Sequence, residues 1–283
     1  MSMFETSDHI RLHYEDWGNG KPVVFVSSWA LDARMWAPHM LHLNALGLRC
    51  IALDRRGHGR SDRPGHGYEY DRLADDLAEL IAHLDLHDIT LIAHSMGTSE
   101  CTRYLSRHGR ERIARVVFIG ATAPCYVQSE SYPQGLPREA FVAISDVLRN
   151  DLPGWLRDNA EPFFLPAETG VPEDVTRWTI DCVLNASLKA LIDCFLARTH
   201  ADMRDELRAL NIPMLIIHGD RDASEPGHGR MVAELVPDSR YIEYAGAPHG
   251  IYHTHRERLL ADIDRFIGEE CRTTHDNRTA RAA

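Results

Sequence analysis

Ile89-Thr90-Leu91-Ile92-Ala93-His94-Ser95-Met96-Gly97 is the stretch of this sequence that decides its fold. The apolar run 89–93 predicts a buried strand, and residues 97–105 predict a helix. A serine presented on a tight strand-to-helix turn needs small residues two positions before and after it, as Ala93 and Gly97 are. The helix N-terminus supplies free N–H groups, so the Met96 amide is placed to bind a developing oxyanion. We therefore predict that Ser95 is a nucleophile; the alternative is a serine that only caps the helix.

The same strand signature recurs along the chain. Short apolar runs predict further buried strands at 23–27, 49–53, 116–119, 214–217 and 241–244. Between them lie helical patterns such as Leu73, Leu77 and Leu80, with acidic residues on the opposite face. Alternating strands and helices predict an α/β fold with a mostly parallel central sheet flanked by helices. We also expect an antiparallel hairpin to involve 9–14.

One long segment interrupts this alternation. Between Cys125 and about Asp205 there is no strand-like run, only helical pieces at 137–149, 152–159 and 173–197. We predict a core formed by 1–125 and 206–268, with 126–205 inserted as a helical cap over the open end of the sheet. The polar segment 269–283 lacks periodicity and predicts a flexible tail.

Candidates for a base and an acid follow two later predicted strands. A serine nucleophile needs a base that is itself oriented by an acid. The strand 214–217 leads into His218-Gly219-Asp220-Arg221-Asp222, and the strand 241–244 leads into Ala245-Gly246-Ala247-Pro248-His249-Gly250. Because catalytic loops gather at the carboxyl ends of parallel strands, we expect His249 as the base and Asp220 or Asp222 as the acid. A metal site formed by His249, His253 and His255 is an alternative that lacks a carboxylate partner.

The charge composition of the chain limits the kinds of partner that we expect it to bind. There are 42 acidic against 31 basic residues in 283, giving a net charge of −11. Such a balance does not attract nucleic acid or anionic lipid, so we expect no nucleic-acid or membrane partner. The six cysteines form no C-x-x-C pair, and we find no signal peptide or membrane span, so we expect a cytoplasmic protein. A homo-oligomer is possible on this sequence.

Together these features resemble the α/β-hydrolase superfamily, and within it the small arylesterases, lactonases and cofactor-free haloperoxidases or perhydrolases. The resemblance runs from about residue 12 to 267. It rests on Asp54-Arg55-Arg56-Gly57-His58-Gly59-Arg60-Ser61-Asp62, Leu73-Ala74-Asp75-Asp76-Leu77, Ala186-Ser187-Leu188-Lys189-Ala190-Leu191 and Gly246-Ala247-Pro248-His249-Gly250. It implies a Ser-His-Asp triad that needs neither cofactor nor metal. It also implies that the acid is the fifth residue of His-Gly-x-x-Asp, Asp222, with Asp220 second.

The chain departs from this family at the oxyanion loop. Family members usually carry His-Gly and an aromatic residue where this chain has Ser27-Ser28-Trp29. The resemblance therefore assigns the Trp29 N–H to the oxyanion hole beside Met96, while Ser28 restricts the loop. Relatives efficient in perhydrolysis typically have proline at the next position, where Ala30 stands. We therefore expect little peracid formation.

Residues 54–62 are charged and rich in glycine but lack the Gly-Lys-Ser/Thr end of a phosphate-binding loop. They predict a turn after a strand, held by Asp54 and by Arg55 or Arg56. We expect this turn to pack near the oxyanion loop.

We expect a serine hydrolase that cleaves small, fairly apolar carboxylic esters or lactones through an acyl-enzyme. The substrate contacts are assigned to Ser28, Trp29, Phe164 and Trp178. The net charge disfavours anionic substrates by long-range repulsion. Perhydrolysis is the first alternative, testable by halogenation in acetate plus peroxide. A lyase, cofactor-free oxygenase or cyclase is a second, and a small-molecule receptor, marked by a slow single turnover, is a third.

Overall fold

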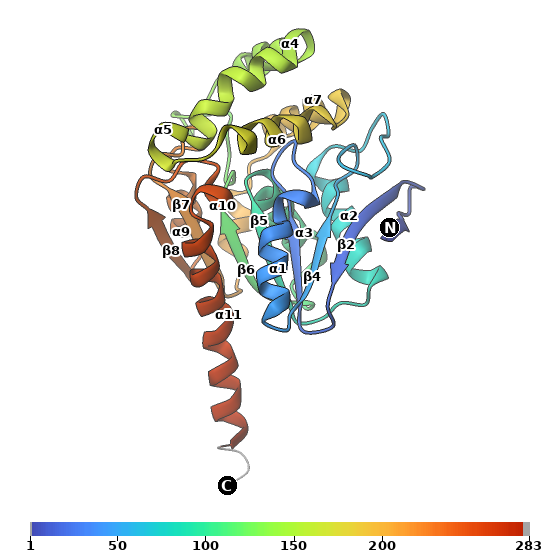
Figure 1. Cartoon of the computed structure of the whole chain (residues 1–283), viewed down its shortest axis with the longest axis vertical. Coiled ribbons are helices and arrows are strands. Elements are labelled where there is room, and N and C mark those ends of the chain that lie inside the picture. Colours follow the sequence, from blue (N-terminus) through green and yellow to red (C-terminus); the bar gives the residue numbers. More distant parts are fainter. Residues whose placement is uncertain (1, 280–283) are drawn as a thin grey trace.

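The computed structural model describes residues 2–279, with side chains from 2 to 269. The described residues form an eight-stranded sheet in the order β1-β2-β4-β3-β5-β6-β7-β8 (Figure 1). Every strand predicted from an apolar run is present. The strands are β1 (Ser2–Glu5), β2 (Arg11–Trp17), β3 (Pro22–Val26), β4 (Arg49–Leu53), β5 (Ile89–His94), β6 (Ile113–Ile119), β7 (Met214–Gly219) and β8 (Ser239–Tyr244).

The sheet is parallel except at one edge. Strands β4, β3, β5, β6, β7 and β8 pair in parallel, whereas β1 pairs antiparallel with β2 and β2 antiparallel with β4. The expected N-terminal hairpin is therefore confirmed. All six positions of β5 are buried, as expected for a central strand covered on both faces.

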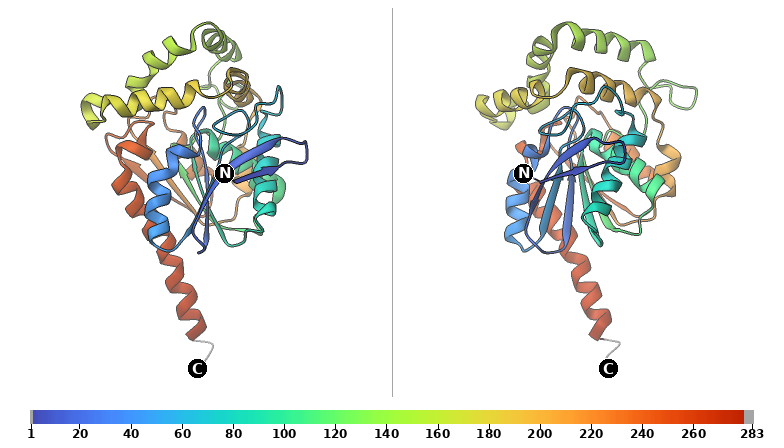
Figure 2. Two further views of the ribbon diagram at one scale, coloured as in Figure 1. Left: turned by 45° about the vertical axis from the view of Figure 1, so that its right-hand side comes forward. Right: turned by 90° about the vertical axis from the view of Figure 1, so that its right-hand side faces the viewer.

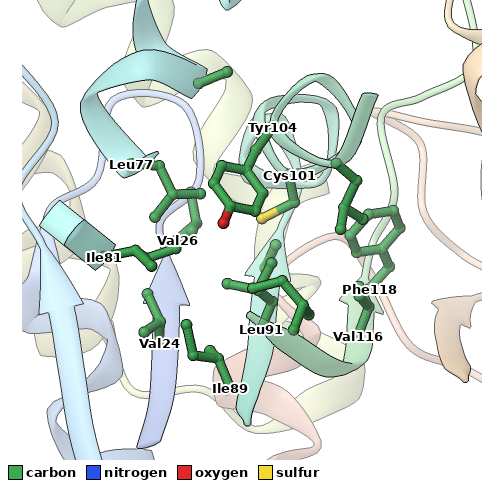
Figure 3. Close-up of a cluster of buried hydrophobic side chains, with 14 of the residues drawn as sticks. Val24, Val26, Leu77, Ile81, Ile89, Leu91, Cys101, Tyr104, Val116 and Phe118 are labelled. Atoms are coloured by element: carbon green, nitrogen blue, oxygen red, sulfur yellow. The ribbon is translucent and has the colours of Figure 1, made fainter. Parts of the chain in front are cut away.

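Helices cover the two faces of the sheet. The buried cluster on one face joins β3, β5 and β6 to α2 (Tyr70–His83) and α3 (Met96–His108), and Figure 3 shows Leu77, Ile81 and Tyr104 packed over Val24, Leu91 and Phe118. The helices α8 (Arg204–Ala209) and α9 (His228–Leu235) extend the same face. The opposite face is covered by α1 (Ala37–Ala45), α10 (Ile251–Thr254) and α11 (Arg256–Thr279). The expected α/β fold is thus confirmed.

Segment 126–205, expected to be a cap, is helical and lies above the carboxyl ends of the strands (Figures 1 and 2). It contains α4 (Arg138–Phe164), α5 (Pro166–Thr169), α6 (Glu173–Leu184), α7 (Leu188–Ala197) and the short turn η2 (Arg198–His200); a similar turn, η1 (Ala33–Trp36), precedes α1. The two helices predicted at 137–149 and 152–159 meet at a kink in α4, where Asp151 has φ −152° and ψ 66°. Its carboxylate accepts a hydrogen bond from the Gly154 N–H at 2.9 Å, which caps the second half of α4.

The C-terminal segment begins as part of a helix. Helix α11 continues to Thr279, so residues 269–279 of the predicted flexible tail are helical (Figure 1). No glycine or proline occurs between 269 and 279 to end the helix. The flexibility assigned to 269–283 stays a prediction, and 280–283 lie outside the described residues. No helix in the described part of the chain combines the length and apolar character needed to cross a membrane.

Candidate active site

Ser95 occupies the sharp turn between β5 and α3. Its backbone has φ 53° and ψ −124°, a left-handed conformation that is uncommon for a residue with a side chain. Gly97 allows the turn, because a Cβ at that position would lie 2.6 Å from the Val26 carbonyl oxygen. At position 97 a small residue is therefore required for steric reasons. Backbone strain of this kind at an exposed strand end is a frequent property of nucleophile turns.

The structure brings Ser95, His249 and Asp222 into one hydrogen-bonded chain. The Ser95 hydroxyl donates to His249 Nε2 across 2.9 Å, and His249 Nδ1–H donates to Asp222 Oδ2 across 2.7 Å. Asp220, the second candidate for the acid, instead accepts the Gly246 N–H at 2.7 Å. The geometry therefore favours Asp222 over Asp220.

Electrostatics agree with this arrangement. Burial raises the pKa of Asp222, but the His249 charge and hydrogen bond outweigh burial and hold that pKa well below its usual value. Burial lowers the pKa of His249, but the Asp222 charge and hydrogen bond raise it above 6.5. Backbone N–H groups of Ser224 and Glu225 each donate to Asp222 Oδ1 at 3.0 Å and fix the carboxylate. An ionised acid thus orients the base and raises its pKa.

Three buried polar side chains hold the base and the turn in place. His94 Nε2–H donates to the His249 carbonyl at 2.9 Å; burial lowers the pKa of His94 to about 3, which keeps that ring neutral. The Ser95 carbonyl accepts hydrogen bonds from the hydroxyls of Thr98, at 2.7 Å, and Thr122, at 2.9 Å. Thr98 and Thr122 therefore stabilise the turn. The sequence carries no signal for the part played by Thr122.

The candidate oxyanion hole lies between the turn and the loop after β3. Among the hydrogen bonds of the described residues, the N–H groups of Trp29 and Met96 have no acceptor. Both remain available to a ligand, as the sequence predicts. Ser28, expected to restrict the loop, has no left-handed backbone; the unusual backbone falls on Ala30, with φ 67°.

Arg55 supports this loop from below. Its guanidinium donates to the carbonyls of Ser27, at 2.8 Å, and Ser28, at 3.2 Å. The same group is paired with Glu100 of α3, whose Oε1 lies 2.7 Å from Arg55 Nε. The expected turn near the oxyanion loop is present, and Arg55 is the arginine that reaches the loop. Arg56 instead pairs with Asp76 at 2.6 Å.

A cavity of about 390 Å³ opens above Ser95 and His249. Its volume lies within the roughly 300–1,000 Å³ range of small-molecule sites. Apolar and aromatic side chains of the cap form much of its wall, among them Trp155, Leu156, Phe163, Phe164, Ile180, Val183 and Phe195. Trp29 closes it from the core side and is anchored to the cap, since its Nε1–H donates to the Leu191 carbonyl at 2.9 Å.

Three of the four predicted substrate contacts line this cavity: Ser28, Trp29 and Phe164. The fourth, Trp178, is a correction: its side chain is absent from the lining and the residue is 40 % exposed. Helix α6 turns Thr176, Thr179, Ile180 and Val183 toward the cavity. Helical periodicity places residue 178 about 200° around the axis from residue 176, on the outer face.

Sequence reasoning missed two charged residues of the lining, Arg198 and Glu225. Arg198 follows α7 directly and Glu225 lies in the loop after Asp222. No motif marks either position, because each is an isolated charge in a segment read for its apolar residues or for its aspartate. Their closeness, with Arg198 Nη1 3.5 Å from Glu225 Oε1, depends on the packing of the cap onto the core.

The alternative metal site does not assemble around the three histidines. His253 packs against Phe164, with ring centroids 6.3 Å apart, and His255 bonds Thr254 across 2.8 Å. Within the part of the chain that the structure describes, no group of three or more His, Cys, Asp or Glu side chains is arranged to hold a metal ion.

Comparison with known proteins agrees with the fold. The family profile of the alpha/beta hydrolase fold matches residues 21–179. A non-heme chloroperoxidase of Kitasatospora aureofaciens is 36 % identical over 95 % of this chain and 100 % of its own length. A bromoperoxidase of Bacillus anthracis superposes with a TM-score of 0.87 at 36 % identity, covering 94 % of this chain and 100 % of its own. An esterase of Exiguobacterium antarcticum superposes with a TM-score of 0.90 at 29 % identity, covering 94 % and 99 %. This chain belongs to the α/β-hydrolase fold family.

Proposed function

We propose that this protein is a serine hydrolase that cleaves small carboxylic esters or lactones through an acyl-enzyme. The observation that carries the proposal is the chain of hydrogen bonds from Ser95 through His249 to Asp222, set beneath a largely apolar cavity. The esterase among the similar structures supports the same reaction class.

In the proposed reaction, the same side chains act once in acylation and once in deacylation. The Ser95 oxygen attacks the ester carbonyl while His249 Nε2 takes the hydroxyl proton, and the resulting oxyanion is bound by the N–H groups of Trp29 and Met96. The C–O bond then breaks, and His249 returns its proton to the leaving alcohol. A water molecule, deprotonated by His249, then attacks the acyl-enzyme; the bond to the Ser95 oxygen breaks, His249 returns the proton to that oxygen, and the carboxylic acid is released. Asp222 keeps Nδ1 protonated and stabilises the charged ring throughout.

The cavity supports substrates with a small apolar body. Aromatic side chains from the cap and from the oxyanion loop meet above the serine: Trp29 lies 5.6 Å from Trp155 and 6.0 Å from Phe195 between ring centroids. Removing the apolar surface of a ligand from water stabilises its complex by about 25 cal/mol per Å². We therefore assign the acyl chain or lactone ring to this aromatic wall.

The test is turnover of p-nitrophenyl esters and lactones of graded chain length, combined with fluorophosphonate labelling. We expect wild type to label and turn over. Ser95→Ala should lose labelling and about 10⁴-fold or more in kcat. Ser106→Ala removes an exposed serine of the same helix and should change neither. Ester turnover near the wild-type rate in Ser95→Ala would overturn the proposal.

Perhydrolysis is the second candidate, because two of the similar proteins are named as haloperoxidases. In it, a carboxylic acid acylates Ser95 and hydrogen peroxide replaces water, so that a peracid leaves. The backbone at Ala30 disfavours this reading: its φ of 67° is incompatible with proline, the residue typical of efficient perhydrolases. We expect halogenation in acetate plus peroxide to be far slower than ester hydrolysis. The reverse ratio would make perhydrolysis the main activity.

A further inference from the structure

Arg198 places a buried positive charge in the wall of the cavity. Its side chain is 13 % exposed and lines the same cavity as Ser95 and His249. Within the described residues its guanidinium makes no hydrogen bond, and its Nε has no partner. A guanidinium carries five N–H donors and is always charged. The donors of Arg198 are therefore largely unused in the free protein.

The contacts around Arg198 fix the guanidinium without satisfying its donors. Its Cζ lies over two aromatic rings, 4.7 Å from the centroid of Tyr126 and 5.0 Å from that of Phe195. Such cation–π contacts stabilise the charge through the ring faces. They supply no oxygen to the in-plane N–H groups, which are the groups that bind carboxylates in pairs.

Glu225 compensates this charge only in part. Its Oε1 lies 3.5 Å from Arg198 Nη1, longer than a good hydrogen bond. Its other oxygen, Oε2, accepts a hydrogen bond from His228 Nδ1–H at 2.9 Å. Glu225 is 2 % exposed, so its carboxylate is buried and is held by His228. The cavity wall consequently offers one cation with free donors beside one acid that has another partner.

We propose that the cavity accepts esters or lactones whose non-reacting end carries a carboxylate, and that Arg198 binds this carboxylate. The inference rests on the proposed ester hydrolysis and names its substrate class. A monoanion fits better than a phosphate, which carries about −1.5 to −2 charges at pH 7 and would be repelled by the neighbouring Glu225. The net charge of −11 predicts poor binding of anionic substrates. The proposal reverses that prediction inside the cavity, because the effect of surface charges is screened beyond about 8–10 Å.

The test measures binding without turnover, in the Ser95→Ala background, by quenching of the fluorescence of Trp29 and Trp155 in the cavity wall. The ligands are monomethyl succinate, glutarate and adipate, each compared with its dimethyl ester, which has the same chain without the charge. 4-Acetoxybutanoate and its methyl ester place the carboxylate on the alcohol side instead. We expect at least one monoanion to bind about tenfold or more tightly than its neutral partner.

Three variants, each made in the Ser95→Ala protein, test whether Arg198 causes the preference for monoanions over neutral esters. Arg198→Met should abolish it while leaving the affinity for the dimethyl esters within about twofold, which also shows that the cavity is intact. Arg198→Lys, which keeps the charge but not the paired donors, should retain part of it and serves if the methionine variant does not fold. Arg177→Met removes an exposed arginine of the cap and should have no effect.

Equal affinities of charged and neutral ligands, no binding of any monoanion, or a preference that survives Arg198→Met would each overturn the inference. Failure of the proposed function is a separate result. In that case wild type would not turn over any ester, whether or not the Ser95→Ala protein prefers the monoanions.

Discussion

The guanidinium of Arg55 should control the oxyanion hole through the loop that carries Trp29. It donates to the carbonyls of Ser27 and Ser28 while it is paired with Glu100. In Arg55→Met the Ser27 carbonyl loses its donor, the Ser28 carbonyl keeps only the Leu31 N–H at 3.4 Å, and Glu100, which is 3 % exposed, is left without its cation. We therefore expect loss of both stability and rate.

The two losses have different sizes and can be separated. Breaking a buried ion pair by removing one partner costs about 3–5 kcal/mol, and each carbonyl left without a donor costs about 1–3 kcal/mol. We expect the free energy of unfolding of Arg55→Met to fall by at least about 3 kcal/mol. The loss of a properly placed oxyanion donor costs up to about 10²–10³-fold in kcat, so a displaced Trp29 N–H should lower kcat by between tenfold and that limit.

The double variant Arg55→Met/Glu100→Met distinguishes the two effects. Removing both charges should restore the part of the stability lost with the ion pair, since a buried pair can be replaced by apolar residues at little cost, while the loss from the Ser27 carbonyl remains. The rate should stay low, because the loop still lacks the hydrogen bonds from Arg55 to the carbonyls of Ser27 and Ser28. Glu100→Gln, which keeps an oxygen for Arg55, should retain near wild-type kcat.

The assays are urea unfolding at pH 7 and the kcat of p-nitrophenyl ester hydrolysis. If kcat in the double variant returns to within about twofold of wild type, Arg55 acts only through stability and the reasoning on the loop is wrong.

Two further predictions concern the base and the cap. Because Asp222 raises the pKa of His249 above 6.5 in spite of burial, kcat/KM should be lost as the pH falls through this raised pKa, when the base becomes protonated. In Asp222→Asn the midpoint should move to lower pH and kcat should fall by about 10⁴-fold; an unchanged midpoint in a pH–rate profile would contradict the pairing. Phe164→Ala should cost about 3–5 kcal/mol in unfolding and change kcat/KM, since this side chain is 1 % exposed and lines the cavity. The exposed Trp178→Ala should leave kcat/KM unchanged and unfolding within about 0.5 kcal/mol; equal effects of the two variants would mean that our placement of the cap face is wrong.

Strand and helix positions in the core could be predicted because their signals are local. A buried parallel strand is apolar at every position, as β5 is, and an amphipathic helix such as α2 repeats its apolar residues every three or four positions. The turn at Ser95 is equally local, since it requires only a strand, a small residue at Gly97 and a following helix. The helix beyond residue 269 has no such local signal, because a helix needs no amphipathic pattern when nothing in the sequence breaks it.

The cap could be predicted as helical but not oriented. Its apolar residues include both Phe164, which faces the cavity, and Trp178, which is exposed. Hydrophobicity alone does not show which of the two side chains is buried. Which face of a cap helix is covered depends on where the core lies. The same limit hides Arg198, because its contacts with the Tyr126 ring and with Glu225 come from distant segments.

By itself, the sequence determined the alternation of strands and helices, the turn that presents Ser95, and the two loops that hold its candidate partners. Only the tertiary structure showed that Asp222, and not Asp220, contacts His249, because the two acids share one loop and differ in which neighbour they meet. Only it brought Arg198 into the cavity. The physical reason is range: propensity and periodicity act over a few residues, whereas Ser95 and His249 are 154 positions apart and meet through the packing of the whole sheet.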